Sequence, residues 1–488
     1  MIIIISMSSQ QFFAGKHGVS VSYHDDYAVS KSFSCTFIAQ SQRLIANGKE
    51  WLLYIEFVQH IIREQMFLGG NVMNQLPERK IICLDMRSFY ASCAAAIEGL
   101  DVMETPIAII GNKQRKGGVV LAASPPLKKR FGIKTGMRLF EIPDDPSIQL
   151  IEPTMEFYIK VSMEITHLLN QYVPKEAIHV YSIDESFVDL EGTERLWGPP
   201  RETVARIQSD LLNQFQLHSA CGMGPNMLLS KLALDLEAKK TGFAYWGYDD
   251  VPAKLWPIAP LSEMWGIGRR LEHSLNEMGI YSVGDLAHAS LPQLEEKFGV
   301  MGNQLYHHAH GIDLSELGAP LIEGQVSYGK GQILFRDYKR REDVLAVVLE
   351  MCEDVAMRAR TARRAGRSVQ LSVGYSKNAL GGGFSRSKSL PEETNDTMKI
   401  YALCTELFDT FHDGRPVRQL SLSLSNLVEE HSMQLSLFDQ RKWKTRKLGE
   451  TVDELRSKYG SASVLRAVSY TDAGTARHRA SLIGGHVK

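Results

Sequence analysis

Apolar runs in the first half of the chain end at acidic residues. Residues 81–84 are all apolar, as in a strand buried on both faces, and Asp85 follows them directly. Further along, Asp184 and Glu185 lie between two short apolar stretches, a pattern that predicts two strands joined by a tight polar turn. The sequence therefore predicts three carboxylates at the ends of strands.

Helical and mixed patterns fill most of the remaining chain. An amphipathic helix is predicted around Lys231. Residues 261–313 have glycine pairs beside short helical patterns, beginning with Gly266 and Gly268, which predicts two helix-hairpin-helix units. From 331 to 427 the order is strand, helix, strand, strand, helix, strand, as in a ferredoxin-like unit. The predicted fold class is α/β in the broad sense, an α+β multidomain protein.

Length and composition fit a multidomain protein that is not embedded in a membrane. The 488 residues are 44% hydrophobic, and no stretch has the uncharged length that spans a bilayer. The six cysteines lack zinc-ligand or disulfide spacing, which favours a reducing cytoplasm. The net charge of −1 hides basic runs: five arginines lie between 358 and 367, and residues 441–488 hold eleven Lys or Arg against four Asp or Glu. Such runs are often solvated faces, but they also suit contact with nucleic acid.

Three carboxylates at strand ends suit a site for divalent metal ions. Magnesium takes oxygen ligands and keeps some of its waters, so two or three acids and the phosphates of a substrate complete its coordination. Two such ions stabilise the attacking and leaving oxygens in nucleotidyl transfer. Each acid alone would more often be a helix cap or part of a polar turn, so the inference depends on the combination.

Two local motifs carry a family resemblance. Residues 83–93, Cys-Leu-Asp-Met-Arg-Ser-Phe-Tyr-Ala-Ser-Cys, resemble the first catalytic motif of Y-family DNA polymerases, particularly the bacterial UmuC-like and UvrX-like branch. Residues 181–186, Tyr-Ser-Ile-Asp-Glu-Ser, resemble the second motif. The resemblance covers about residues 79–440 and implies a right-hand polymerase with palm, fingers, thumb and little finger. It further implies DNA-directed addition of deoxynucleotides to a primer 3′ end, in low-fidelity translesion synthesis during DNA repair or damage tolerance.

The resemblance assigns roles to residues of both motifs. Asp85, Asp184 and Glu185 become the catalytic carboxylates and, with the Met86 carbonyl, the ligands of two Mg²⁺ ions, with Mn²⁺ as an alternative. Tyr90 becomes the steric gate, whose ring excludes a ribose 2′-hydroxyl. The other residues implied in binding the deoxynucleoside triphosphate are Phe89, Lys231 and Lys129.

The fingers segment departs from the family pattern. The family has a Tyr and an Arg shortly before a Phe-Gly-Ile/Val-Lys-x-Gly segment, which is found here at 131–136. Pro126 and Lys129 occupy those two positions, so Lys128 or Lys129 would supply the charge, without the two-pronged geometry of arginine. Arg87 replaces a frequent acid of the family at a position that is not a metal ligand.

Contacts with primer–template DNA are expected from the thumb and the little finger. Gly266 and Gly268 allow backbone amides to approach a DNA phosphate, which holds DNA without reading its sequence. Arg358 and Arg364 would add salt-dependent contacts from the little finger.

A short string in the basic tail resembles the peptide by which bacterial proteins bind the sliding clamp. Its implied anchors are Gln434, Leu435, Leu437 and Phe438. A similar string at 419–423 lacks the aromatic residue and falls in the last predicted strand, so the copy in the tail is favoured.

The patterns and the resemblance divide the chain into five regions. These are an N-terminal extension (1–72), palm and fingers (73–250, with the fingers at about 89–152), thumb (251–320), little finger (324–430) and a basic tail (431–488). The extension is interpreted as a translated leader, because the family's first strand usually begins within a few residues of the start methionine and Met73 would give that arrangement. The codons of Gly69 and Gly70 can form a ribosome-binding sequence at a suitable distance from Met73.

Two other classes of protein share parts of this pattern. A nucleotidyl cyclase also uses strand-end carboxylates and two metals, but the helix-hairpin-helix pair argues against it. A non-catalytic scaffold bound to DNA and clamp would lack the metal acids, and all three are present. The histidines at 307, 308 and 310 have no acidic or cysteine neighbours in sequence and are interpreted as structural.

Overall fold

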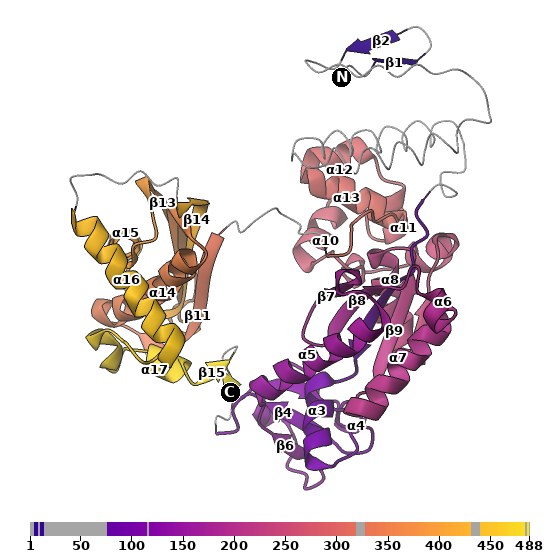
Figure 1. Ribbon diagram of the computed structural model, residues 1–488, viewed down its shortest axis with the longest axis horizontal. Coiled ribbons are helices and arrows are strands. Elements are labelled where there is room, and N and C mark those ends of the chain that lie inside the picture. Colours follow the sequence, from indigo (N-terminus) through magenta and orange to yellow (C-terminus); the bar gives the residue numbers. More distant parts are fainter. Residues whose placement is uncertain are drawn as a thin grey trace. The chain divides into compact units, whose positions relative to one another are not determined.

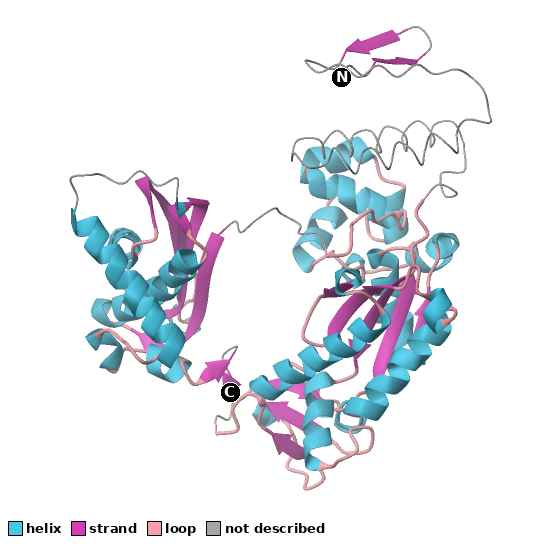
Figure 2. Cartoon of the chain, viewed as in Figure 1, coloured by secondary structure: helices cyan, strands magenta, loops and turns pink. Residues whose placement is uncertain are grey.

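The computed structural model describes residues 4–7, 10–13, 76–114, 117–318, 327–430, 440–483 and 486–487. The chain divides into two compact units, Met1–Pro77 and Glu78–Lys488. In the first unit, β1 (Ile4–Met7) and β2 (Gln10–Phe13) form an antiparallel hairpin. The second unit holds the other sheets and the helices drawn in Figures 1 and 2.

The palm is built on a five-stranded sheet in the order β10-β9-β3-β8-β7. The central strand β3 (Ile81–Met86) pairs antiparallel with β8 and β9, and its first four residues are fully buried because helices cover both faces. The strand predicted at 81–84 and the strand pair around the acids are thus confirmed. The remaining elements are α5 (Met155–Tyr172), β7 (Ile178–Val180), β8 (Glu185–Asp189), α6 (Glu194–Trp197), α7 (Pro200–Phe215), β9 (Ser219–Gly224), α8 (Met227–Ala233), α9 (Lys239–Thr241) and β10 (Phe243–Tyr245).

A smaller sheet follows α3 (Phe89–Glu98) in the sequence, with strand order β5-β4-β6. Its central strand β4 (Ile107–Ile110) is buried along its whole length. Ile107 and Ile109 face small alanines of α3, and the alternate residues of β4 face Leu127 of α4. The other elements are β5 (Val120–Ala123), α4 (Pro125–Phe131) and β6 (Gln149–Ile151).

The segment predicted as helix-hairpin-helix consists of four short helices. They are α10 (Arg269–Asn276), α11 (Val283–Ala287), α12 (Leu291–Phe298) and α13 (Val300–Ala309). The chain that leaves α13 is bound to the start of α8 in the palm. Asn226 donates from Nδ2 to the carbonyl of Gly311 at 2.8 Å, and Asp313 accepts from the amide of Leu228 at 3.2 Å. Both contacts fix the end of the helix that carries Lys231.

The little finger has the element order that the sequence predicts. Its antiparallel sheet runs β11-β14-β12-β13, with α14 and α15 against one face. Leu420 and Leu422 of β14 point into this core. Ser421 and Ser423, which alternate with them along the strand, point to the open face. The elements are β11 (Ser327–Tyr338), α14 (Arg341–Thr361), β12 (Arg364–Tyr375), β13 (Gly383–Thr394), α15 (Thr397–Phe411) and β14 (Val417–Glu429).

The C-terminal tail contains more regular structure than the sequence predicts. Its helix α16 spans Gln440–Tyr459. Ion pairs join α16 to the little finger, among them that of Arg360 with Asp453. The following elements are α17 (Ala476–Arg479), β15 (Leu482–Ile483) and β16 (His486–Val487). Across the described ranges, none of the helices has the length and apolar character needed to cross a membrane.

Candidate active site

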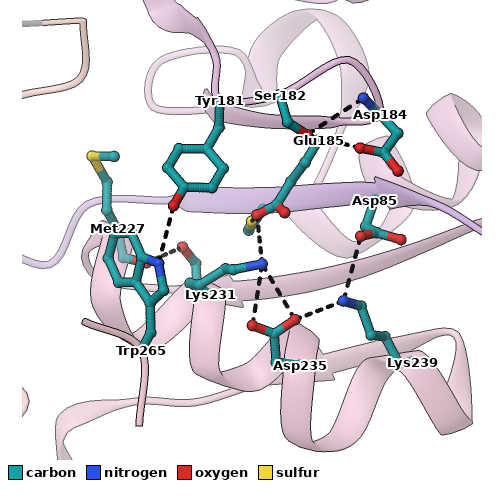
Figure 3. Close-up of polar contacts among 12 residues, drawn as sticks. Asp85, Tyr181, Ser182, Asp184, Glu185, Met227, Lys231, Asp235, Lys239 and Trp265 are labelled. Carbon is teal, nitrogen blue, oxygen red and sulfur yellow. Dashed lines mark hydrogen bonds and ion pairs between the residues drawn. The ribbon is translucent and has the colours of Figure 1, made fainter. Parts of the chain in front are cut away.

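The three predicted catalytic acids meet at one edge of the palm sheet (Figure 3). Asp85 lies near the end of β3 and pairs in register with Glu185, the first residue of β8. Asp184 ends the turn before β8, where its carbonyl accepts a hydrogen bond from the Met86 amide at 2.9 Å. Its carboxylate accepts one from the Ser182 hydroxyl at 2.8 Å. Strand pairing therefore joins two motifs that lie far apart in the sequence.

Glu185 is buried and has two polar partners on one oxygen. Lys231 places Nζ 2.7 Å from its Oε1, and the Cys83 thiol donates to the same atom at 3.1 Å. Only 8% of Glu185 and 6% of Lys231 are exposed. Burial opposes the charge of Lys231, but the hydrogen bond to Glu185 and the surrounding negative charge raise the pKa of Lys231 above its usual value. Burial also raises the pKa of Cys83 well above its usual range, so the thiol is neutral.

A second lysine lies against Asp85. Lys239 places Nζ 3.4 Å from Oδ2 of Asp85 and 2.7 Å from Oδ1 of Asp235. Asp235 also contacts Lys231, whose Nζ lies 3.1 Å from Oδ2. Burial raises the pKa of Asp85 to about 6; Lys239 opposes this shift, and the neighbouring acids add to it. Positive and negative groups thus alternate through the site.

Carboxylate oxygens at this edge have the chemistry that Mg²⁺ prefers. As the side chains are placed, no three His, Cys, Asp or Glu residues in the described part of the chain stand close enough to hold a metal ion. In Figure 3, Glu185 faces Lys231 and Asp85 faces Lys239, so each of these two acids has a lysine as its cationic partner. The acids fit a metal site when these lysine contacts are exchanged for metal contacts.

The two aromatic residues at the start of α3 differ in exposure. Tyr90 is partly exposed and stacks on Tyr158 of α5, with ring centroids 4.6 Å apart. Burial and the charge of Asp184 raise the pKa of Tyr90, so its hydroxyl is neutral. Phe89 is 3% exposed and its side chain belongs to the palm core; its part in nucleotide binding stays a prediction. Of the two rings, that of Tyr90 is the more exposed.

Of the two lysines weighed for the fingers, Lys128 points toward the acids. Its Nζ donates to the Ser88 hydroxyl at 3.1 Å. Partial burial lowers the pKa of Lys128, and attraction from Asp85 opposes that change. Both lysines are exposed, and Lys129 follows Lys128 on α4 at an angle of about 100°, so the two side chains face different directions. The geometry favours Lys128.

The predicted glycine hairpin adjoins the catalytic turn through Trp265. Gly266 has φ +94°, a conformation that favours glycine, and Gly268 is the N-cap of α10. Trp265 donates from Nε1 to the hydroxyl of Tyr181 at 3.3 Å (Figure 3). Tyr181 begins the turn that ends at Asp184, so the hairpin is held beside the acids.

Arg358 and Arg364 in the little finger each have an acidic partner. Arg358 lies 3.2 Å from Asp354 and donates to the carbonyl of Gly329. Arg364 lies 3.5 Å from Glu429. Both guanidinium groups stay partly exposed, so the pairs do not bury the charges that were predicted to meet DNA.

The predicted clamp-binding residues Gln434, Leu435, Leu437 and Phe438 lie outside the described residues. The similar string at 419–423 belongs to β14, where Leu420 and Leu422 are buried in the little-finger core. That string cannot offer its leucines to a partner without unfolding the sheet.

The histidines in and directly after α13 are involved in local packing. Burial lowers the pKa of both His308 and His310, which favours neutral rings. Nδ1 of His310 lies 2.9 Å from the carbonyl of Tyr306, one helical turn earlier.

Sequence reasoning missed Asp235, Lys239 and Tyr158. A signal for the first two exists, because Lys231, Asp235 and Lys239 are spaced four residues apart, the spacing of helical ion pairs. Such spacing usually marks a solvated surface, and only the sheet packed beneath gives it another meaning. Nothing in the sequence singles out Tyr158 from other core aromatics.

Comparison with known protein families agrees with this geometry. The model of the impB/mucB/samB family matches residues 84–235, which include all three acids and Lys231. The model of that family's C-terminal domain matches 325–437. The thumb-domain model of DNA polymerase-iota matches 262–313, the four short helices.

Individual relatives match over nearly their whole length. The UvrX protein of Bacillus subtilis (strain 168), named for UV-damage repair, is 56% identical over 415 residues, which are 85% of this chain and 99% of UvrX. DNA polymerase IV 2 of the same organism is 37% identical, over 85% of this chain and its own full length. A solved Y-family DNA polymerase chimera of Dbh and Dpo4 has a TM-score of 0.56 at 20% identity, over 72% of this chain and 99% of the chimera. The chain belongs to the Y family of DNA polymerases.

Proposed function

We propose that this protein is a translesion DNA polymerase that extends a primer 3′ end by two-metal nucleotidyl transfer. The observation that carries the proposal is the convergence of Asp85, Asp184 and Glu185 at one edge of the palm sheet, with Lys231 beside them. Bound Mg²⁺ or Mn²⁺ ions would stabilise the charge on the attacking and leaving oxygens.

The side chains around the acids bind and select the deoxynucleoside triphosphate. Lys231 and Lys128 supply positive charge for the phosphates. Lys129, the neighbour of Lys128 on α4, is the weaker candidate because its side chain faces another direction. Tyr90 closes the space beside the sugar, and the ring of Tyr158 behind it fixes its position. A ribose 2′-hydroxyl would meet the Tyr90 ring, so deoxyribose is preferred.

Primer–template DNA is held by the thumb and the little finger without reading sequence. The amides at Gly266 and Gly268 would meet a phosphate, and Arg358 and Arg364 add charge. Serine hydroxyl groups line the open face of the little-finger sheet. They can donate hydrogen bonds to the DNA backbone, whatever its base sequence. These are Ser368, Ser372, Ser385, Ser387, Ser389, Ser421, Ser423 and Ser425.

The proposed setting is damage tolerance in the cytoplasm, with a sliding clamp as partner. The name of the similar UvrX protein supports a place in the response to UV damage. Gln434, Leu435, Leu437 and Phe438 would anchor the clamp. Changing Leu437 and Phe438 to Ala should remove stimulation by the clamp and leave basal extension unchanged, because the anchors lie outside the palm. Ser436→Ala, between the anchors, is the control; equal clamp binding by the double variant and the parent would show that the motif is accidental.

A primer-extension assay tests the proposal as a whole. The full chain is incubated with Mg²⁺, deoxynucleotides and a primer placed before an undamaged base or a lesion in the template. We expect extension on both templates. A cyclase would form cyclic nucleotide without DNA, and a scaffold would bind DNA without extending it; either result would overturn the proposal.

A further inference from the structure

The C-terminal tail is docked on the little finger, that is, packed against α14 and β11. The helix α16 and the 3-10 turn Ala467–Tyr470 lie along α14 (Figure 1). The hydroxyl of Tyr338 in β11 donates to the carbonyl of Ala473 at 3.0 Å, and Ala473 is buried in the little-finger core. The family model of this domain ends at residue 437, so the docked part of the tail lies beyond it.

A cavity of about 260 Å³ lies where the tail meets α14 and β11. Thr475 of the tail lines it and donates from its amide and its hydroxyl to Oε2 of Glu350, at 2.9 and 2.8 Å. Both the little finger and the tail form its walls, so the cavity exists only while the tail is docked. Its charged lining residues are Lys330, Glu350, Glu353, Asp354, Arg456 and Arg479.

Two acids in the lining are each paired with two cations. Glu353 accepts from Arg456 at 3.0 Å and from Arg466 at 2.7 Å. Asp354 lies 3.3 Å from Lys330 and also pairs with an arginine of α14. Two cations against one carboxylate leave one positive charge in each group, and therefore two in the walls of the cavity.

Arg479 of α17 adds a guanidinium group that has no partner. Its Nε is buried without a hydrogen-bond acceptor, and no carboxylate in the described part of the chain forms an ion pair with the group. Burial lowers the pKa of Arg479, whereas attraction from Glu350 and Asp354 opposes this change, so the group stays charged. A buried donor without an acceptor is costly and often marks the place of an ion or a water molecule.

We propose that this cavity is a binding site for a small phosphate anion, held by Arg479 together with Lys330 and Arg456. A phosphate monoester carries a charge of about −1.5 to −2 at pH 7, which balances the surplus of the walls. A guanidinium group binds two phosphate oxygens at once, so the free donors of Arg479 suit this ligand. The bound anion would join α17 to β11 and α16 and thereby stabilise the docked tail.

Inorganic phosphate, titrated into the full chain, tests the site through the stability of the docked tail. Hydrogen exchange of the amides in 461–480 is measured at constant ionic strength, with chloride as the balancing anion. Phosphate at about ten times its Kd should slow exchange about tenfold, because an anion that binds only the docked tail opposes its opening. Glycerol phosphate, a monoester, shows in a parallel titration whether the cavity also admits an organic phosphate.

The variant Arg479→Gln should raise the Kd for phosphate about tenfold or more, the usual effect of losing a charged hydrogen bond. Arg479→Lys keeps the charge and should recover part of the affinity. Arg477→Gln is the matched control, since it removes an exposed arginine of the same helix that lies over the ring of Tyr470 and outside the cavity lining. It should respond to phosphate as the parent does.

Phosphate-free buffer separates binding by Arg479 from a structural role. Because Arg479 has no partner in the protein, Arg479→Gln should leave exchange of the tail unchanged or slow it, as a partly buried charge is removed. Faster exchange without phosphate would mean that Arg479 itself holds the tail and would overturn the proposal. Asp354→Asn should act in the opposite direction and tighten phosphate binding about threefold, because the walls lose a negative charge.

Two further results would contradict the site. Equal slowing by phosphate in Arg477→Gln and Arg479→Gln would place the effect elsewhere on the protein. Protection of the tail through Arg479 by primer–template DNA, but not by phosphate, would make this arginine a DNA contact. Primer extension by Arg479→Gln in phosphate-free buffer should equal that of the parent, so the phosphate site and the polymerase assignment can each fail without the other.

Discussion

The palm and the little finger both contain ion pairs between buried or partly buried side chains, but the partners are arranged differently. In the palm, Lys231 and Lys239 share Asp235 and also touch the acids at the strand ends. In the little finger, Arg360 forms two hydrogen bonds to Asp453, with side chains only 9% and 14% exposed, and joins α14 to α16. The palm contacts form a chain of alternating charge, and the little-finger contacts form a closed pair.

The difference shows how a buried ion pair can be read for function. Arg360 has its remaining donors on the Asn395 carbonyl and the Thr397 hydroxyl, so its hydrogen-bonding capacity is used within the protein. A group satisfied in this way holds elements together. In the palm each lysine contacts two carboxylates. One of these contacts can be exchanged for another partner while the second contact keeps the lysine in place.

Removing a palm acid should have the largest effect. Asp184→Ala or Glu185→Ala should lower the rate of nucleotide addition by about 10³-fold or more, because metal ligands contribute several kcal/mol to the transition state. Primer–template binding, measured by fluorescence anisotropy, should change little because the proposed DNA contacts lie elsewhere. Glu185→Gln keeps an acceptor for Lys231 and controls for loss of folding. Substantial extension by these variants would show that the charged chain of the palm is structural, like the pair in the little finger.

Changing Tyr90, the proposed gate, should give a smaller, selective effect. Tyr90→Ala should reduce discrimination against ribonucleotides by about tenfold to a hundredfold, because the ring no longer meets the 2′-hydroxyl. The ratio of kcat/KM for matched deoxy- and ribonucleotides measures it. Tyr90→Phe keeps the ring on Tyr158 and should behave as the parent. An unchanged ratio in a folded Tyr90→Ala variant would make Tyr90 a packing residue.

Breaking the closed pair should cost stability without changing the chemistry. Arg360→Met leaves Asp453 without its partner, so the free energy of opening α16 should fall by about 3 kcal/mol, the usual loss when one member of a buried pair is removed. Hydrogen exchange of the α16 amides measures this local opening. Mn²⁺ affinity of the palm should not change. A double-mutant cycle with Asp453→Asn should show strong coupling; additive losses would mean that packing, not the pair, fastens the helix.

An exposed arginine of the same region should give a smaller effect on DNA binding. Arg364→Gln should leave stability nearly unchanged, since exposed ion pairs contribute about 0–1 kcal/mol. Primer–template affinity should fall a few-fold, and the salt dependence of binding should lose about one unit of slope. Arg340→Gln removes a more exposed arginine that faces Glu342 and serves as the control for the change of charge. Equal affinity of the two variants would remove Arg364 from the proposed DNA surface.

The sequence predicts the catalytic half of this comparison well, because its signals are local. An apolar run that ends at Asp85 and a turn containing Asp184 and Glu185 need only strand pairing to form a site, and β3 and β8 supply it. The little-finger element order was predictable for the same reason, since each strand and helix carries its own period.

The remaining features depend on contacts between segments, which no local period reports. The contact of Lys239 with Asp85 needs a π-helical turn and a glycine on another strand. The choice of Lys128 over Lys129 depends on which way α4 faces. The basic residues near 358–367 look alike in sequence. Arg360, however, is buried in an ion pair that joins two helices, and Arg364 is partly exposed. The charged residues can be counted from the sequence, but the partner of each one cannot be identified from it.

The N-terminal extension, residues 1–72, should matter least, because the family models match only residues that follow it. The compact unit that contains the palm begins at Glu78, and the family models match from residue 84 onward. About seventy residues form at best a marginal core of their own, so we propose that the extension adds nothing to the catalytic fold. A protein beginning at Met73 should keep the extension rate, the Mn²⁺ affinity and the salt dependence of DNA binding of the full chain. Removal of residues 1–80, which takes the charged residues before β3 and leaves Ile81 as the first residue, is the contrasting variant and should destabilise the palm. A slower enzyme, or a changed metal affinity, after the shorter deletion would place part of the working site in the extension.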